Sequence, residues 1–263
     1  MSEMPEPGAV NDRWDSYIAL VDDAAASIMV NMHFVEAGAL AGASVLHHWA
    51  LPMRWPGEHG MGTQEEAQGF AAVEDQVTDK LMDLGFYPVG RLRTAGYWQV
   101  SYYAASERGE TLSAVLEEVL GEVAKRAHAE AALDPKWAYF FDLLCPDPQQ
   151  MQWMADRDVV MQLINHGDPL TPRPVQHVIY FDSESQCREF AQYAAAESFD
   201  CAIVMPDDEN PRWMIQATRL DPVELDHIHE VADALRRTAI DHDGDYDGWG
   251  TELVSADPDP TPN

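Results

Sequence analysis

The feature that most constrains the fold is the segment Cys145-Pro-Asp-Pro148, near the middle of the 263-residue chain. Two prolines in three positions prevent a helix or a central strand from continuing through this point. Both sides of the break show amphipathic patterns, and each is long enough to bury a core of its own. The sequence therefore predicts two domains, at residues 14–146 and 147–254, between disordered tails at 1–13 and 255–263.

The N-terminal part alternates strand-like and helix-like patterns. Thr63-Gln-Glu-Glu66 is a capping box that opens a helix, and Gly85 ends it. The expected elements are strands at 14–21, 27–34 and 44–55, a helix at 63–84, strands at 87–94 and 97–104, a helix at 111–129 and a strand at 137–144. The order βββαββαβ predicts an α+β domain, with an antiparallel sheet and helices on one face.

The C-terminal part begins with a helix and then follows a second α+β pattern. The expected elements are helices at 150–165, 183–196 and 222–240, and strands at 177–181, 200–205, 212–218 and 246–254. After the first helix the order is βαββαβ, the ferredoxin-like arrangement. Right-handed crossovers then place both later helices on one face of a four-stranded sheet.

The charge of the chain limits the partners that it can bind. Its 46 acidic and 16 basic residues give a net charge of -30, and residues 147–263 alone hold 24 acidic and 7 basic residues. Such a field repels phosphate backbones and attracts basic protein surfaces, so we expect a basic protein partner and no direct contact with nucleic acid. No apolar run approaches 18 residues and no secretory signal pattern is present, so we expect a cytoplasmic protein without membrane contact.

Motifs for cofactors and nucleophilic catalysis are missing from the sequence. No G-x-S-x-G, Walker loop or G-x-G-x-x-G occurs, and Cys145, Cys187 and Cys201 lack the spacing of a zinc site. We therefore expect no cofactor and no enzymatic activity. The alternative is a hydrolase that uses carboxylates of the N-terminal domain, such as Glu74 and Asp75.

An acidic turn near the C-terminus has the spacing of the start of a calcium-binding loop. Asp243, Asp245 and Asp247, followed by Gly248, fit a D-x-D-x-D-G pattern, in which carboxylates ligate Ca²⁺. Counted from Asp243, the twelfth position should supply a bidentate carboxylate, but it is Val254. We expect no bound metal, and a calcium-binding module at these three aspartates is a further alternative.

Several pieces of the C-terminal part occur together in a known family. They are the helix end Gly167-Asp168, the strand His177-Val-Ile-Tyr-Phe-Asp182, the helix that contains Phe190, the strand pair around Trp213, and Tyr246-Asp-Gly-Trp-Gly-Thr251. Over residues 150–254, these pieces resemble the regulator of ribonuclease activity B family, which inhibits the endonuclease RNase E by binding it. The resemblance implies a non-enzymatic regulator, with a ribonuclease as a candidate partner.

The N-terminal part, over residues 14–143, resembles an uncharacterised bacterial domain that is often found ahead of such a module. The pieces that carry this resemblance are Trp14-Asp-Ser-Tyr17, Ala26-Ser-Ile-Met-Val-Asn31, Val73-Glu-Asp75, Tyr87-Pro-Val-Gly-Arg91 and Tyr102-Tyr-Ala104. This second resemblance implies a fold and no particular activity.

Two groups of residues are candidates for binding a partner. The first lies in the last turn and strand and comprises Asp241, Asp243, Asp245, Tyr246, Asp247 and Trp249. We expect Asp241, Asp243 and Asp245 to be solvated, whereas Tyr246, Asp247 and Trp249 act as surface or as fold determinants. The second group is Arg91 and Tyr102 on the predicted hairpin, where the alternative is that arginine stems cover the edges of an aromatic core.

Overall fold

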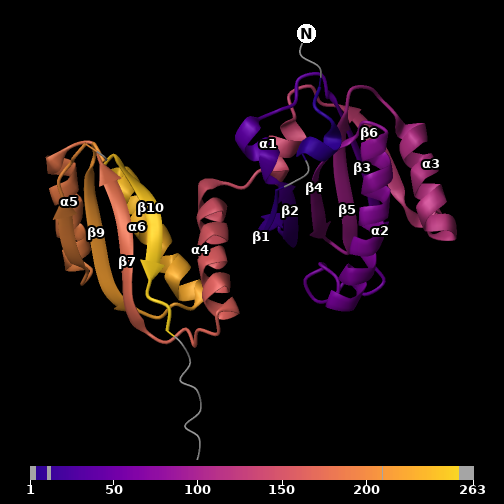
Figure 1. The fold of residues 1–263 in the computed structure, drawn as a ribbon. Helices are drawn as coiled ribbons and strands as arrows, with labels where there is room; N and C mark the ends of the chain where they lie inside the picture. Colours follow the sequence, from indigo (N-terminus) through magenta and orange to yellow (C-terminus); the bar gives the residue numbers. More distant parts are fainter. Residues whose placement is uncertain (1–3, 11–12, 209, 255–263) are drawn as a thin grey trace, which may run out of the picture. The chain divides into compact units, whose positions relative to one another are not determined.

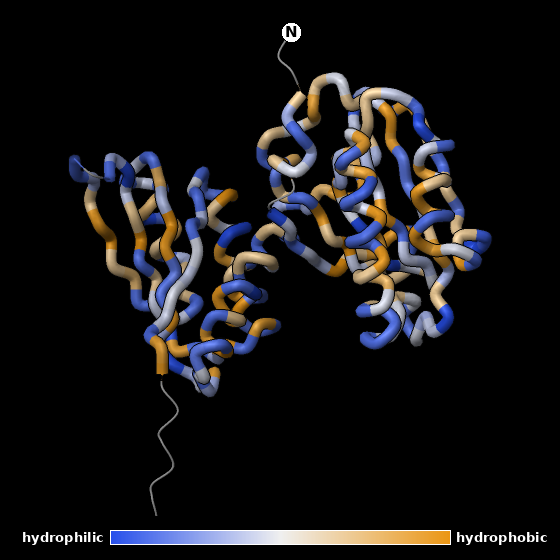
Figure 2. The backbone as a smooth tube through the Cα atoms, turned by 45° about the vertical axis from the view of Figure 1, so that its right-hand side comes forward, coloured by the Kyte–Doolittle hydropathy of each residue, from blue (hydrophilic) through white to orange (hydrophobic). Residues whose placement is uncertain are grey.

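The computed structural model describes residues 4–10, 13–208 and 210–254, and the chain divides into two compact units, Met1–Asp147 and Pro148–Asn263. Each unit contains one antiparallel sheet together with helices (Figure 1). Hydrophobic and hydrophilic residues follow each other along strands and helices alike, as amphipathic elements require (Figure 2). The predicted α+β class and the two-domain layout are thereby confirmed.

The N-terminal unit is built on a six-stranded sheet in the order β1-β2-β4-β5-β3-β6. Its strands are β1 (Trp14–Val21), β2 (Ala24–Asn31), β3 (Val45–Pro52), β4 (Tyr87–Thr94), β5 (Tyr97–Ala104) and β6 (His128–Leu133). Its helices are α1 (Met32–Ala37), α2 (Gln64–Asp83) and α3 (Gly109–Leu120), with 3-10 helices at Pro7–Val10 and Gly121–Arg126 and a π-helix at Phe140–Leu144.

Both faces of this sheet are covered around β5. Side chains alternate along a strand, and Trp98, Val100 and Tyr102 pack in one core with residues of α2 and α3. On the opposite face, the ring of Tyr103 stacks on that of Trp137 with 4.0 Å between centroids. The hydroxyl of Tyr139 accepts hydrogen bonds from residues of the same strand face. The segment from 134 to 144 thus forms a second layer over this sheet.

The last strand of the N-terminal unit lies elsewhere than predicted. The helix expected to run to residue 129 ends at Leu120, and the alanine-rich segment His128–Leu133 pairs with β3 instead of continuing the helix. Residues 137–144 were expected to form a strand, but Asp134 prevents it. Its carboxylate accepts the backbone N–H groups of Ala138 and Tyr139, which opens a helical turn. Tertiary pairing and a cap therefore override the local patterns.

The start of the chain also differs from the prediction. Residues 1–13 were expected to be disordered, yet Val10 is buried, and its carbonyl accepts a hydrogen bond from the Asn31 side chain at 2.8 Å. The hydroxyl of Tyr87 donates to the carbonyl of Pro5 at 2.7 Å. The prediction is therefore wrong for residues 4–10. The tail predicted at 255–263 lies outside the described residues.

The C-terminal unit has a four-stranded sheet in the order β10-β7-β9-β8. Its elements are α4 (Pro148–Asn165), β7 (Arg173–Phe181), α5 (Glu184–Ala196), β8 (Asp200–Val204), β9 (Trp213–Asp221), α6 (Leu225–Asp241) and β10 (Gly244–Thr251). The sequence β7-α5-β8-β9-α6-β10 is the ferredoxin-like βαββαβ arrangement, preceded by α4. Helices α5 and α6 lie on the same face of the sheet (Figure 1).

The core of the C-terminal unit lies between that face and the helices. Ile179, Phe181 and Ile215 from the sheet meet Phe190 of α5 and Leu235 of α6. Helix α4 joins through a smaller cluster, in which its residues Val160 and Leu163 pack with β7 and α6. None of the helices in the described part of the chain combines the length and apolar character needed to cross a bilayer.

Candidate partner-binding surface

Strand β10 carries the aromatic-glycine motif, and a bulge decides where its side chains point. Tyr246 pairs with Ile179, whereas Gly248 pairs with the next residue, Val178, so Asp247 is an extra residue in the ladder. Gly248 has a φ of 137°, which glycine adopts without strain. Because one residue is inserted, Tyr246 and Trp249 both point to the helix-covered face although they are three positions apart. Both therefore pack against the core of the unit.

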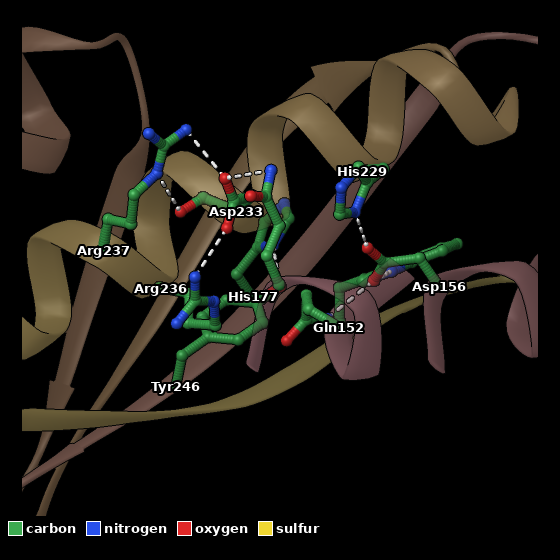
Figure 3. A network of polar contacts seen from close by, with 10 residues as sticks. Gln152, Asp156, His177, His229, Asp233, Arg236, Arg237 and Tyr246 are labelled. Atoms are coloured by element: carbon green, nitrogen blue, oxygen red, sulfur yellow. Dashed lines mark hydrogen bonds and ion pairs between the residues drawn. The ribbon is translucent and has the colours of Figure 1, made fainter. Parts of the chain in front are cut away.

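Trp249 connects β10 with α4 through a buried carboxylate. Its indole Nε1 donates to Oδ1 of Asp156 at 2.9 Å, and only 1% of the Asp156 side chain is exposed. Gln152 donates to the same oxygen at 2.8 Å, and Nδ1 of His229 on α6 lies 2.8 Å from the other oxygen (Figure 3). We call these four residues the Asp156 cluster. It holds α4, α6 and β10 together in one unit.

The carboxylate of the Asp156 cluster is strongly affected by its burial. Burial raises the pKa of Asp156, and the hydrogen bonds from His229, Gln152 and Trp249 oppose this shift. The Asp156 carboxylate accepts hydrogen bonds from three donors, so few of its lone pairs remain available. This arrangement suits a structural role. Removing the carboxylate would leave buried donors without a partner.

A second buried pair lies next to the Asp156 cluster. Nδ1 of His177 on β7 is 2.7 Å from the hydroxyl of Tyr246, and both residues are labelled in Figure 3. His177 is fully buried, and burial lowers its pKa to about 4. Burial, together with the charge of Asp156, raises the pKa of Tyr246 well above its usual value. Both side chains are therefore neutral at physiological pH.

A buried ion pair fixes the end of β10. Asp168, just after α4, pairs with Arg173 at the start of β7, and both side chains are buried. Asp168 also accepts the backbone N–H of Val254 at 2.9 Å, and Arg173 donates to the carbonyl of Glu252 at 3.0 Å. The hydrogen bonds from Arg173 hold the pKa of Asp168 well below its usual range. The segment after β10 is thereby tied to β7.

The four aspartates of the acidic turn are exposed, but they do not converge. Asp243 accepts a hydrogen bond from Gln186 at 3.2 Å, whereas Asp245 pairs with Arg212 at 2.6 Å. Strand β10 begins at Gly244, so a calcium-binding loop does not form over Asp243, Asp245 and Asp247. Within 4–10, 13–208 and 210–254, no three His, Cys, Asp or Glu residues are grouped to hold a metal ion. Asp241 and Asp247 complete the exposed set.

Every arginine of the C-terminal unit forms an ion pair with a carboxylate of the same unit. Residues 148–263 contain seven arginines and no lysine, against 23 acidic residues. Each of these arginines forms at least one ion pair, and Arg212 forms two; they are Arg157, Arg173, Arg188, Arg212, Arg219, Arg236 and Arg237. Two of these, Arg236 and Arg237, meet at the buried Asp233 (Figure 3). The remaining carboxylates give the unit a strongly negative field.

The second predicted group, on the N-terminal hairpin, is largely internal. Tyr102 is fully buried, and its hydroxyl lies 2.8 Å from Oγ1 of Thr78, so it is not available to a partner. Arg91 lies over the ring of Trp98, at 4.4 Å from the centroid, and pairs with Glu74 at 3.3 Å. The structure therefore agrees with the alternative for this group, in which arginine stems cover the edges of an aromatic core.

Glu74 itself lines a cavity of about 390 Å³ together with Asp75, Asp79 and Trp14. Its Oε2 accepts hydrogen bonds from Trp98 at 2.8 Å and from Arg91 at 3.3 Å. Burial raises the pKa of Glu74, and Arg91 opposes the shift. A perturbed carboxylate in a cavity is the feature on which the hydrolase alternative depends.

Sequence reasoning missed the polar residues that support the motif. Asp156, Val160 and Leu163 share one face of α4 at helical spacing, and all three are buried. An aspartate on an otherwise apolar helix face is the signal that a buried partner exists. Nothing in the sequence identifies that partner as Trp249, 93 positions away.

Two family models match the chain, one for each unit. Residues 153–251 match the model described as regulator of ribonuclease activity B. Residues 12–145 match the model of a family of unknown function, DUF695. No curated protein sequence matches the chain. Since the second match covers more than half of its residues, the chain belongs to the family of unknown function DUF695, and it carries a C-terminal unit of the regulator of ribonuclease activity B type.

Proposed function

We propose that this protein is a non-catalytic regulator that binds a ribonuclease of the RNase E type through its C-terminal unit. The observation that carries the proposal is the match of residues 153–251 to regulator of ribonuclease activity B. This match starts within α4 and runs to the last residue of β10, so it includes all of the sheet, α5, α6 and most of α4. The buried polar residues of the unit, the Asp156 cluster and the Asp168–Arg173 pair, are engaged within the fold and form no catalytic arrangement.

The charge distribution indicates what kind of surface the partner presents. All seven arginines of the C-terminal unit are paired internally, so its excess of carboxylates is left for a partner to neutralise. A basic protein surface gains from this field, whereas RNA is repelled by it. The regulator therefore acts on the enzyme and not on its RNA substrate, and we place this interaction in the cytoplasm.

Purified full-length protein and the RNase E of the same organism test the proposal directly. We expect the cleavage rate of a fluorescent RNA to fall as the regulator is added, and we expect the regulator alone not to bind that RNA. Association measured at several ionic strengths should slow steeply between low and physiological salt, because the encounter is electrostatically steered. A cleavage rate that does not change at saturating regulator would refute the proposal.

The acidic turn has its own test within this assay. Reversal of Asp241 and Asp243 to lysine should slow association about tenfold, because both side chains are exposed and lack an arginine partner. Asp245 is left unchanged because it already forms an ion pair with Arg212. The matched control reverses Glu110 and Glu117, two exposed acids of α3 in the other unit. Equal slowing by both pairs would mean that net charge matters and the turn does not.

A hydrolase is the second candidate, and the raised pKa of Glu74 beside a cavity is the observation that favours it. A screen of ester, phosphoester and glycoside substrates with the full-length protein would examine it. Activity that disappears in Glu74→Gln, and is retained in Asp75→Asn, would assign the chemistry to Glu74.

A further inference from the structure

The sheet of the C-terminal unit has one face that its helices do not cover. Along β7, Arg173, Val175, His177, Ile179 and Phe181 are buried, and the residues between them are exposed or half-buried. The registers of β10 and β9 against β7, and of β8 against β9, extend this second face across all four strands. Its residues are Pro174, Gln176, Val178, Tyr180, Asp200, Ala202, Val204, Met214, Gln216, Thr218, Leu220, Asp245, Gly248 and Gly250. We call these residues the open face.

The open face is nearly uncharged, although it belongs to a strongly acidic unit. Asp200 and Asp245 are its only charged residues, and the latter pairs with Arg212, which also pairs with Asp182. Apolar side chains lie at both ends, with Met214 and Val204 at one end and Pro174 and Leu220 at the other, and Leu220 is 68% exposed. Aspartates of the acidic turn that lack an arginine partner, such as Asp243, lie beside it, at the end of edge strand β10. Exposed apolar side chains next to charged residues are a common feature of protein–protein interfaces.

A hollow marks the edge of the open face next to β10. It has a volume of about 450 Å³ and is lined by Gln176, Thr218 and Gly250, with Arg173 and Glu252 at one end. A Cβ atom added at Gly250 would meet nothing within 4 Å, and its φ lies outside the left-handed range. Neither packing nor backbone geometry therefore requires glycine at this position. Its effect in the structure is to keep the hollow open.

We propose that the open face is the docking surface for a segment of a basic protein partner, and that an apolar side chain of this segment sits in the hollow beside Gly250. This inference rests on the proposed function and names the surface that performs it. A second copy of the chain is a poor occupant, because it would bring a net charge of -30 against the same charge. A basic segment instead gains from the neighbouring aspartates while its apolar residues cover the exposed apolar side chains of the open face.

Two variants of the full-length protein test the docking surface against purified RNase E from the same organism. Gly250→Leu fills the hollow, and Leu220→Lys adds a positive charge beside it, because Leu220 pairs with Pro174, which lines the hollow. Each should raise the Kd at least about tenfold, as expected for a residue that the docked segment covers. Leu220 is exposed, so its variant tests the proposal even if Gly250→Leu folds poorly.

The controls repeat both changes in the other unit. Gly69→Leu fills equally open space on α2, and Leu133→Lys replaces a leucine that is 77% exposed on β6. Both should bind with the wild-type Kd. Wild-type Kd values for Gly250→Leu and Leu220→Lys would overturn the docking surface and leave the proposed function standing. A wild-type protein that does not bind at all would overturn both.

Sedimentation velocity tests whether a second copy of the chain covers the open face instead. We expect a monomer for the wild-type protein at micromolar concentration. A dimer that Leu220→Lys dissociates would show that a second copy covers the open face, and this result would also overturn the proposal.

Discussion

Each of the two units buries a helix carboxylate against the indole N–H of a strand tryptophan, but they surround it differently. In the N-terminal unit, Glu74 of α2 accepts from Trp98 at 2.8 Å and pairs with Arg91. In the C-terminal unit, Asp156 of α4 accepts from Trp249 at 2.9 Å, with His229 as its basic neighbour. The same contact is therefore supported by an ion pair with arginine in one unit and by a hydrogen bond with histidine in the other.

The two sheets also differ in how many of their faces are covered. The N-terminal sheet is covered on one face by α2 and α3 and on the other by residues 134–144, as the stacking of Trp137 on Tyr103 shows. The C-terminal sheet has helices on one face only (Figure 1). A face that is not used for the core remains free for binding. The C-terminal unit therefore leaves one face of its sheet uncovered by its own helices, whereas both faces of the N-terminal sheet are covered around β5.

The largest expected effect comes from removing the Asp156 carboxylate. Asp156→Ala leaves three donors without their acceptor and should cost the C-terminal unit about 4 kcal/mol of unfolding free energy. Urea denaturation measures the loss, and hydrogen exchange assigns it to α4 and β10. Asp158→Ala is the control, because the Asp158 side chain is 58% exposed and its loss should cost under about 0.5 kcal/mol. Equal losses would show that the cluster adds no stability.

The next effect is a pH dependence caused by His177. Its pKa is about 4 in the folded protein, against an ordinary value of 6.5, so the unfolded chain binds the proton more readily. Stability of the C-terminal unit should therefore be complete above pH 6.5 and fall by up to about 3 kcal/mol as the pH drops to 4. The raised pKa of Asp156 acts in the opposite sense. Comparison with His177→Gln at each pH isolates the histidine, and parallel curves would contradict its role.

A smaller loss is expected in the N-terminal unit. Glu74→Ala should lower its unfolding free energy by about 2 kcal/mol, because Trp98 loses its acceptor while Arg91 keeps its contact with the tryptophan ring. Thermal unfolding followed by calorimetry can separate this unit from the other. Asp75→Ala, at an exposed neighbouring position, is the control and should be close to neutral. A loss as large as that of Asp156→Ala would erase the contrast between the two contacts.

The smallest effects compare the covered and uncovered sheet faces with one matched substitution. A Cβ at Gly90 would lie 2.7 Å from a methyl group of Leu144 and 3.0 Å from the carbonyl of Met29. Gly90→Ala should therefore cost about 1–2 kcal/mol, whereas Gly250→Ala should stay within about 0.5 kcal/mol. Chemical denaturation of both variants measures the difference. A clear loss from Gly250→Ala would mean that its face is packed.

Much of the fold could be predicted where a local signal agrees with the tertiary structure. Thr63 caps α2 and Ser183 caps α5, each through its side-chain oxygen, and the C-terminal βαββαβ order follows from hydrophobic periodicity. The prediction failed where backbone pairing or a distant contact decided the outcome. The alanine-rich β6 has little strand propensity and forms because β3 offers an edge.

The candidate site shows the same division. Sequence alone determined that the turn around Asp243 is exposed and acidic and that the C-terminal motif ends a ferredoxin-like unit, because charge and periodicity are properties of neighbouring residues. Only the tertiary structure decided that Tyr246 and Trp249 point inward and that Gly250 opens outward. A single inserted residue at Asp247 reverses the side-chain alternation of β10, and its position depends on the register with β7. That register is a pairing between segments about 70 residues apart, which local patterns do not encode.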